Sequence, residues 1–210
     1  MIGIVDYRAG NLTSVARALT FLGIPWEITD DPAVLERARG IIFPGVGAAG
    51  EAMANLKEKG LDVCLREWFS RGKPILGICL GTQVIFGYSE EDDTPCLGIV
   101  PGMVKRFDHG LSIGGRPLKI PHMGWNNVEF VKKHPIFTGI PEGAEFYFVH
   151  SYYPVPQDET NVVGRTYYGK KFCSAVAVGN LVALQFHPEK SGRFGLRILS
   201  NFCRMAGEIC

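Results

Sequence analysis

The 210-residue sequence lacks the charge imbalance that is typical of nucleic-acid-binding proteins. It has 22 lysines and arginines against 21 aspartates and glutamates, a formal net charge of +1 at pH 7. Binding to a phosphate backbone needs clustered positive charge, so nucleic acid is not an expected ligand. No apolar run approaches the roughly 18–20 residues of a membrane helix, and no basic segment precedes the apolar start. We therefore expect a cytoplasmic protein that does not act at a membrane.

The sequence also lacks any pair of cysteines with the C-x-x-C spacing of metal and redox sites. Its six cysteines are Cys64, Cys79, Cys96, Cys173, Cys203 and Cys210. Because no export signal is present, reduced and mostly buried thiols are expected rather than three disulfides, and no metal is expected. Glycine, in contrast, is abundant, with 26 residues. Glycines gather where the backbone turns tightly or approaches a ligand closely.

The first half of the sequence alternates between apolar runs and helical patterns. Short apolar runs predict strands over Ile2–Asp6, Ile24–Thr29, Gly40–Phe43 and Pro74–Ile78. Between them, helical patterns run from Leu12 to a capping Gly23, begin again at Asp31-Pro32, and fill residues 48–71 with a break near Gly60. This alternation predicts an α/β fold with a mostly parallel central sheet and helices on both faces.

The second half of the sequence is rich in strand-forming residues from Leu97 to about Val178. Phe146–Val155 and Leu181–His187 are predicted as strands, and a final helix is predicted from a serine cap at Ser191 to about Ala206. No repeat, low-complexity tract or linker interrupts the sequence. We therefore expect a single domain over residues 1–210.

The motif Gly77-Ile78-Cys79-Leu80-Gly81 follows an apolar strand and precedes a predicted helix. This is the context of a nucleophile elbow, with cysteine in place of serine. A thiol at a helix N-terminus is exposed to the positive end of the helix dipole, which favours the thiolate. The alternative is a core cysteine between packing glycines; the strand–turn–helix context favours a nucleophile.

A cysteine nucleophile needs a base, and His187 stands at the end of a predicted strand, followed by Pro188 and Glu189. A carboxylate two residues along can orient the imidazole and stabilise its charged form, which completes a Cys79–His187–Glu189 triad. Taken separately, His187 is more simply a polar strand-end residue and Glu189 a charge at a helix start. Together with the elbow, they favour catalysis.

The loop Pro44-Gly45-Val46-Gly47 follows the third predicted strand. A tetrahedral intermediate needs backbone donors, and the amide of Leu80 is one candidate. The others, from Val46 and Gly47, would come from this loop, whose glycines permit a peptide to reorient. A plain tight turn explains the loop equally well.

These motifs resemble those of class I glutamine amidotransferases, which use a Cys-His-Glu triad. The resemblance is closer to the glutaminase subunits of imidazole glycerol phosphate synthases, which act in histidine biosynthesis. It rests on segments that span nearly the whole chain in the family's order: residues 5–7, 10–12, 43–47, 77–83, 121–126, 147–153 and 185–192. Arg8, Ala9, Thr82 and Gly87 depart from the family's commoner residues, and Thr82 could alter packing beside the elbow.

The resemblance implies how the site residues divide the work. Cys79 would attack the carboxamide of glutamine, and His187, oriented by Glu189, would protonate ammonia and then activate water. The family's glutamine-binding positions correspond to Gly47, Gln83, Glu91, His150, Ser151 and Tyr152. Glu91 also lies in the acidic run 90–93, which alone would indicate a solvated surface.

The resemblance further implies a partner and no cofactor. Ammonia would pass to a separate cyclase subunit with a (β/α)₈ barrel, because the sequence lacks the roughly 250 residues of such a barrel. Tyr147 and Lys190 would lie on the heterodimer interface. The alternatives are a paralogous glutaminase that feeds another synthase, a stand-alone cysteine hydrolase, and a non-catalytic interaction subunit; the intact triad argues against the last.

Overall fold

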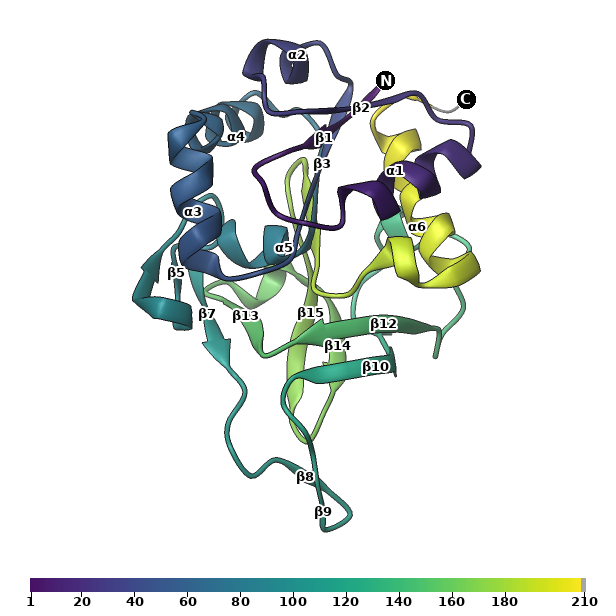
Figure 1. Ribbon diagram of the computed structural model, residues 1–210. Helices are drawn as coiled ribbons and strands as arrows, with labels where there is room; N and C mark the ends of the chain where they lie inside the picture. Colours follow the sequence, from purple (N-terminus) through teal and green to yellow (C-terminus); the bar gives the residue numbers. More distant parts are fainter. Residues whose placement is uncertain (209–210) are drawn as a thin grey trace.

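The computed structural model describes residues 1–208, and its centre is a mixed eight-stranded sheet (Figure 1). In spatial order the strands are β11 (Glu129–Phe130), β14 (Val162–Tyr167), β15 (Lys171–Val178), β16 (Leu181–Leu184), β4 (Ile75–Cys79), β3 (Gly40–Gly45), β1 (Ile2–Val5) and β2 (Trp26–Thr29). The pairs from β16 through β4, β3 and β1 to β2 are parallel, and the pairs from β11 to β16 are antiparallel. The predicted fold class is confirmed.

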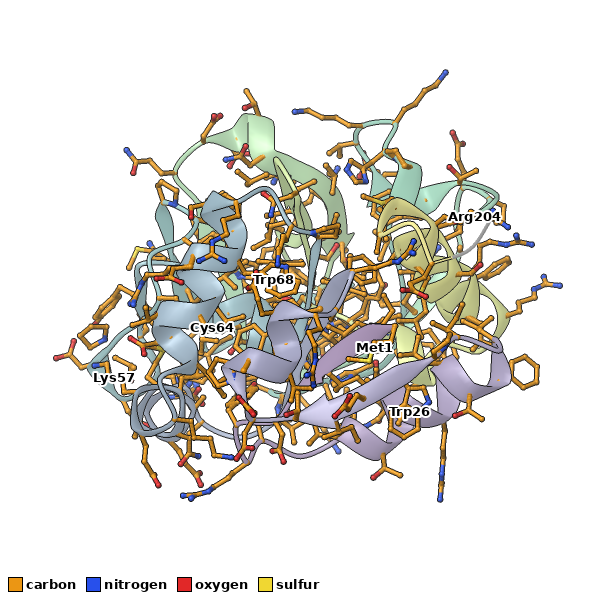
Figure 2. All side chains as sticks on the ribbon, turned by 90° about the horizontal axis from the view of Figure 1, so that it is seen from above. Met1, Trp26, Lys57, Cys64, Trp68 and Arg204 are labelled. Atoms are coloured by element: carbon orange, nitrogen blue, oxygen red, sulfur yellow. The ribbon has the colours of Figure 1, made fainter. Side chains whose placement is uncertain are left out.

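The helices cover both faces of this sheet (Figure 1). They are α1 (Leu12–Phe21), α2 (Pro32–Glu36), α3 (Ala49–Glu58), α4 (Leu61–Ser70), α5 (Leu80–Val84) and α6 (Gly192–Met205). Apolar residues of α1 and α6 form one core cluster with the sheet, and those of α3, α4 and α5 form a second. Trp68 of α4 lies deep in the second cluster, whereas Trp26 of β2 lies nearer the surface (Figure 2). Burial of these apolar faces stabilises the layered arrangement.

The remaining strands and the short 3₁₀ helices lie mostly in the second half of the chain. They are β5 (Tyr88–Ser89), β6 (Thr94–Pro95), β7 (Gly102–Arg106), β8 (Ser112–Ile113), β9 (Arg116–Pro117), β10 (His122–Asn127), β12 (Glu145–His150) and β13 (Tyr152–Pro156), with η1 (Glu91–Asp93), η2 (Pro135–Phe137), η3 (Glu159–Asn161) and η4 (Pro188–Lys190). β13, β7, β5 and β6 form one small sheet, β10 and β12 form another, and β8 and β9 form a projecting hairpin (Figure 1). The strand-rich second half is confirmed.

Local signals in the sequence explain several element boundaries. The side chain of Asp31 accepts a 2.8 Å hydrogen bond from the amide of Ala33, and Pro32 opens α2, as predicted. Gly23 (φ 70°) follows the end of α1, and Gly60 (φ 67°) separates α3 from α4. Both glycines adopt the left-handed conformation that side chains disfavour.

Three boundary predictions were wrong. The segment predicted as one strand over Phe146–Val155 is two strands, because Ser151 ends β12 and the chain then joins a different sheet as β13. The strand predicted to reach His187 ends at Leu184. Ser191 precedes α6 but does not cap it with its side chain, since its hydroxyl donates to the carbonyl of His187 instead.

The parallel strands bring distant segments to one edge of the sheet. β1, β3, β4 and β16 are neighbours, so their carboxyl ends lie side by side. Tyr7 follows β1, the Val46–Gly47 loop follows β3, Cys79 ends β4, and His187 follows β16. Ligands of α/β sheets bind beyond the carboxyl ends of the strands. The predicted site residues therefore meet where such a fold binds its ligand.

Candidate active site

Cys79 occupies a strained elbow between β4 and α5. Its φ of 54° and ψ of −107° lie outside the regions that L-residues ordinarily adopt. The flanking glycines allow this turn to pack against its neighbours: a Cβ on Gly81 would lie 1.8 Å from the carbonyl oxygen of Phe43, and one on Gly77 would lie 3.1 Å from Cβ of Ala183. The G-x-C-x-G pattern therefore reflects close packing around a buried turn, in which a side chain at Gly77 or Gly81 would meet its neighbours.

His187 and Glu189 form a buried pair behind Cys79. Nδ1 of His187 and Oε1 of Glu189 are 2.7 Å apart, and both side chains are fully buried. The amide of Asn11, which has a φ of 78°, also donates to Oε1. This second donor fixes the carboxylate that in turn orients the imidazole.

The charges around His187 favour its protonated form. Burial opposes the charge, but the Cys79 sulfur and the Glu189 carboxylate outweigh burial and raise the pKa of His187 to about 10. Nε2 of His187 is buried and has no hydrogen-bond partner among residues 1–208. An imidazolium with a free N–H beside the sulfur can stabilise a thiolate and donate a proton to a leaving group.

A pocket of about 270 Å³ opens over Cys79. It is lined by all the residues predicted to contact glutamine, which are Gly47, Gln83, Glu91, His150, Ser151 and Tyr152, together with Val46, Cys79, Leu80, Pro121 and Val149. His187 and Glu189 lie behind the pocket wall. A cavity of this size, with polar groups from several elements around a thiol, suits a small polar substrate.

The predicted oxyanion loop lies beside the thiol. Gly45 pairs with Cys79 in the β3–β4 ladder, and Gly47 has a φ of 111° that favours glycine. Beneath this loop, the fully buried hydroxyl of Tyr7 contacts Gly45 and has no hydrogen-bond partner in the described chain. The structure brings Val46, Gly47 and Leu80 to one side of the pocket, and their role as donors remains a prediction.

Glu91 lines the pocket, and its carboxylate is hydrogen-bonded to the N-terminus of α3. Its Oε2 accepts a 2.8 Å hydrogen bond from the amide of Ala49, the first residue of α3. Burial raises the pKa of Glu91, and the Ala49 amide acts in the opposite direction. The carboxylate is thereby fixed at the pocket rim and is not merely part of a solvated acidic run.

His150 is buried and neutral in this environment. Burial lowers the pKa of His150 to about 3, and its Nδ1 lies 2.7 Å from the carbonyl oxygen of Tyr152. That carbonyl also accepts a 3.1 Å hydrogen bond from Nε2 of Gln83. Three of the predicted glutamine-contacting residues therefore hold one another in place.

Tyr147 and Lys190 lie together at the surface beside the triad. Nζ of Lys190 is 6.0 Å from the centre of the Tyr147 ring, which lies 6.5 Å from the His187 ring. On the paired strand β10, the side chains of Met123 (63% exposed) and Trp125 (54% exposed) extend the same apolar surface. We call Met123, Trp125, Tyr147 and Lys190 the β10–β12 face.

The residues that depart from the family's commoner pattern are accommodated locally. Thr82 is fully buried, and its hydroxyl donates a 2.7 Å hydrogen bond to the carbonyl of Leu184 at the end of β16. Arg8 forms an exposed ion pair with Glu58 at 3.1 Å. Gly87 lies beside Gly102, where a Cβ would approach the Gly102 carbonyl oxygen to 3.3 Å. None of these positions lines the pocket.

The sequence interpretation missed three groups that contact the site: Tyr7, Asn11 and Gln185. All three lie in segments that carried the resemblance, but nothing in their spacing assigned them a contact. Gln185 lies two residues before His187, and its amide lies 3.8 Å from the Cys79 sulfur. A buried amide beside a predicted base is a signal that could have indicated this contact.

Cys64, Cys79, Cys96, Cys173 and Cys203 are free thiols, as predicted, and Cys210 lies outside the described residues. Residues 1–208 contain no cluster of three or more histidine, cysteine or acidic side chains placed to hold a metal ion. No helix within that range is both long and apolar enough to cross a membrane.

Comparison with known proteins assigns the family. The profile of the family "Glutamine amidotransferase class-I" matches residues 4–206. The chain is 51% identical, over 100% of its own length and 99% of the relative, to "Imidazole glycerol phosphate synthase subunit HisH" of Maridesulfovibrio salexigens. The protein of the same name from Desulfovibrio desulfuricans is 53% identical over 99% of this chain and 97% of its own length. The one from Moorella thermoacetica is 52% identical over 96% of this chain and 93% of its own length.

Solved structures agree on the fold. One described as "Crystal structure of glutamine amidotransferase" has a TM-score of 0.75 at 21% identity, covering 98% of both chains. Another, "Structure of PurLQS from Thermotoga maritima", has a TM-score of 0.72 at 21% identity and covers 97% of both chains. The chain belongs to the class I glutamine amidotransferase family, in the branch of the imidazole glycerol phosphate synthase subunits HisH.

Proposed function

We propose that this chain hydrolyses glutamine to glutamate and ammonia and passes the ammonia to a separate cyclase subunit. That partner would use it to make imidazole glycerol phosphate and an aminoimidazole carboxamide ribotide in histidine biosynthesis. The observation that carries the proposal is the Cys79–His187–Glu189 arrangement beside a pocket lined by the glutamine-contacting positions. Full-length identity of about half to subunits of imidazole glycerol phosphate synthase supports the choice of partner.

The first half-reaction forms a thioester. The Cys79 thiolate attacks the carboxamide carbon of glutamine, and the carbonyl oxygen becomes an oxyanion. The amides of Leu80, Val46 and Gly47 are the donors proposed for that oxyanion. His187 then transfers its proton to the amide nitrogen, the C–N bond breaks, and ammonia leaves.

The second half-reaction regenerates the enzyme. Neutral His187 takes a proton from water, the resulting hydroxide attacks the thioester carbon, and the C–S bond breaks to give glutamate and the Cys79 thiolate. Glu189 holds the imidazole in the required orientation and stabilises its charge throughout. The pKa of His187, raised to about 10, keeps the proton available for the first step at neutral pH.

The β10–β12 face is the proposed docking surface for the cyclase. Met123 and Trp125 expose large apolar side chains on this face, and the Tyr147 ring lies 6.5 Å from the His187 ring. Contact there would place the partner next to the point at which ammonia is released. The proposed assembly is a heterodimer in the cytoplasm, with a (β/α)₈ barrel as the partner and no metal or organic cofactor in this subunit.

Synthesis assays with the purified pair test this function. The chain is mixed with the cyclase and its phosphoribulosyl nucleotide substrate, and imidazole glycerol phosphate formation is measured with glutamine as the only nitrogen source. We expect product with glutamine and with ammonium salt alike. Product with ammonium salt but none with glutamine would overturn the proposal, and glutamine-dependent product only with another synthase would establish the paralogue alternative.

A further inference from the structure

The amide of Gln185 donates to the sulfur of the proposed nucleophile. Nε2 of Gln185 lies 3.8 Å from Sγ of Cys79, within the range of a hydrogen bond to sulfur, and Gln185 is fully buried. We propose that Gln185 is a further catalytic residue, whose N–H stabilises the Cys79 thiolate; this inference rests on the proposed function. A charged acceptor strengthens such a bond, especially away from water.

The orientation of the Gln185 amide follows from its neighbours. Oε1 of Gln185 accepts a 3.2 Å hydrogen bond from Nε2 of Gln83, and the same Nε2 donates to the carbonyl oxygen of Tyr152 at 3.1 Å. A backbone carbonyl accepts only, so Gln83 must present its NH₂ group there. Gln185 must therefore present oxygen to Gln83, which leaves its NH₂ group facing Cys79.

A histidine pair holds the Tyr152 carbonyl from the other side. Nδ1 of His150 faces that carbonyl at 2.7 Å and so carries its proton on Nδ1. Nε2 of His150 then accepts from Nδ1 of His122 at 2.9 Å, and Nε2 of His122 faces Nδ2 of Asn126 at 3.2 Å. Asn126 also donates to the carbonyl of Tyr167 at 3.0 Å.

This arrangement is a continuous polar chain that leaves each member one orientation. It runs from Asn126 through His122, His150, the Tyr152 carbonyl, Gln83 and Gln185 to the Cys79 sulfur. The backbone carbonyls of Tyr167 and Tyr152 fix the direction of donation, because carbonyls cannot exchange roles. His122, His150, Gln83 and Gln185 are all at least 95% buried, so water does not compete for these bonds.

The polar chain complements the triad. His187 places a positive charge beside the sulfur, and Gln185, in the same loop after β16, supplies a neutral N–H. Gln83, His150 and His122 act through Gln185 or the pocket wall and are positioning residues. Loss of the N–H should therefore weaken the nucleophile itself rather than glutamine binding alone.

Alkylation of Cys79 by iodoacetamide, measured by mass spectrometry of its peptide between pH 5 and 9, tests this assignment. Gln185→Glu replaces the donor with a carboxylate of the same shape, and Gln185→Met removes the donor without adding charge. We expect alkylation at pH 7 to slow about 10- to 100-fold in both variants, the range for hydrogen bonds to charged groups. Wild-type rates in a folded Gln185 variant would overturn the proposal.

A matched control is Asn201→Asp. Asn201 is another buried amide, which donates to the carbonyls of Ile136 and Thr138 at 2.9 Å each, far from the thiol in the fold. We expect it to lower stability but to leave Cys79 alkylation unchanged. Equal slowing in the Asn201 and Gln185 variants would mean general loosening of the fold and would contradict the proposal.

A spectroscopic measurement needs no Gln185 substitution. In ¹⁵N-labelled protein, Cys79→Ala should shift the side-chain NH₂ resonances of Gln185 and leave those of Asn201 in place. Unshifted Gln185 resonances would overturn the contact even if the Gln185 variants failed to fold. Neither readout uses glutamine, so failure of glutamine hydrolysis in the wild-type complex would overturn the proposed function and not this one.

Discussion

At the residue scale, the triad histidine and carboxylate perform unequal tasks. In the proposed mechanism His187 exchanges protons with the reacting groups, whereas Glu189 acts through its hydrogen bond to His187. Removal of a general base disables both half-reactions, whereas removal of its orienting charge leaves a weaker base in place. We therefore expect the loss of His187 to lower turnover more than the loss of Glu189.

The first prediction compares His187→Asn with Glu189→Gln. We expect kcat for glutamine hydrolysis, measured in the complex with the substrate-loaded cyclase, to fall about 10⁴-fold or more in His187→Asn. Glu189→Gln should cost less, and a glutamyl thioester should accumulate slowly or not at all in His187→Asn. Equal and mild losses, measured as ammonia released per second at saturating glutamine, would indicate a structural role for both.

The second prediction concerns Asn11. Its amide holds Glu189 from a backbone conformation that costs energy for a non-glycine residue. Asn11→Gly should relax the backbone and yet lower kcat, because the carboxylate loses a donor. We expect a loss of about 10-fold in kcat with little change in thermal stability, because relief of the backbone strain offsets the lost hydrogen bond; turnover measurements and calorimetry check the two together. A wild-type kcat would exclude the positioning role.

The third prediction is that the protein loses stability in acid because two of its histidines are buried in the neutral form. Burial lowers the pKa of His122 to about 4 and of His150 to about 3. Between pH 6.5 and 4 the unfolded chain binds protons at these residues and the native chain does not, so stability falls as pH falls. Each should contribute roughly 2 kcal/mol between pH 7 and pH 5.

Urea unfolding of His122→Gln at pH 7 and pH 5 checks this contribution. The variant should lose about 2 kcal/mol less stability over that interval than the wild type. His109→Gln, at an exposed loop position, is the matched control and should follow the wild type. A decline of the same size in all three proteins would contradict the account.

His187 has the opposite effect on stability. Its pKa is raised to about 10, so it contributes stability that is lost as pH rises from 6.5 toward 10.

At the scale of elements, we expect the proposed oxyanion loop after β3 to connect glutamine hydrolysis to binding of the partner. Gly47, at a φ of 111°, is the residue of this loop at which we expect the peptide to be able to reorient. Such a reorientation upon docking would complete the oxyanion hole only when ammonia can be used. The loss of one oxyanion donor typically costs about 10²–10³ in rate, which suffices for such control.

The fourth prediction is that partner binding raises kcat rather than only lowering KM. At saturating glutamine, the isolated chain should turn over at least 10²-fold more slowly than the substrate-loaded complex. The runner-up mechanism, in which the partner merely completes the glutamine pocket, would change KM and leave kcat unchanged. Equal kcat values would therefore exclude control through this loop.

The elements that could be predicted from sequence are those with local signals. The strand and helix positions of the first half follow from periodicity, and the elbow follows from five adjacent residues. The division of residues 146–155 into two strands does not, because it depends on β12 pairing with β10 and β13 with β7. The polar chain to Cys79 was likewise hidden, since its members come from four distant segments.

At the scale of the whole molecule, the β10–β12 face lies beside the active site. An exposed tryptophan elsewhere on the surface provides a control for its proposed role in docking. Trp125 is 54% exposed on this face, and Trp26 is 37% exposed on β2. Trp26 lies toward the periphery of the molecule on the strand at the opposite edge of the central sheet from β11 (Figure 2). Both tryptophans are exposed, but only Trp125 belongs to the proposed interface.

The fifth prediction uses this pair. Trp125→Ala should weaken association with the cyclase by at least 10-fold in Kd, because exposed aromatic residues commonly dominate interface energies. Trp26→Ala should leave Kd unchanged. Titration calorimetry of each variant against the cyclase gives both values. An effect confined to Trp26→Ala would place the interface elsewhere.

The central claim is that Cys79 attacks glutamine and that the ammonia crosses to a partner. Its most direct test is the activity of the Cys79→Ser complex with two nitrogen sources. We expect glutamine hydrolysis and glutamine-dependent synthesis to be lost, while ammonium-dependent synthesis stays at the wild-type rate, because the cyclase is intact. Glutamine hydrolysis by the Cys79→Ser complex at the wild-type rate would contradict the account.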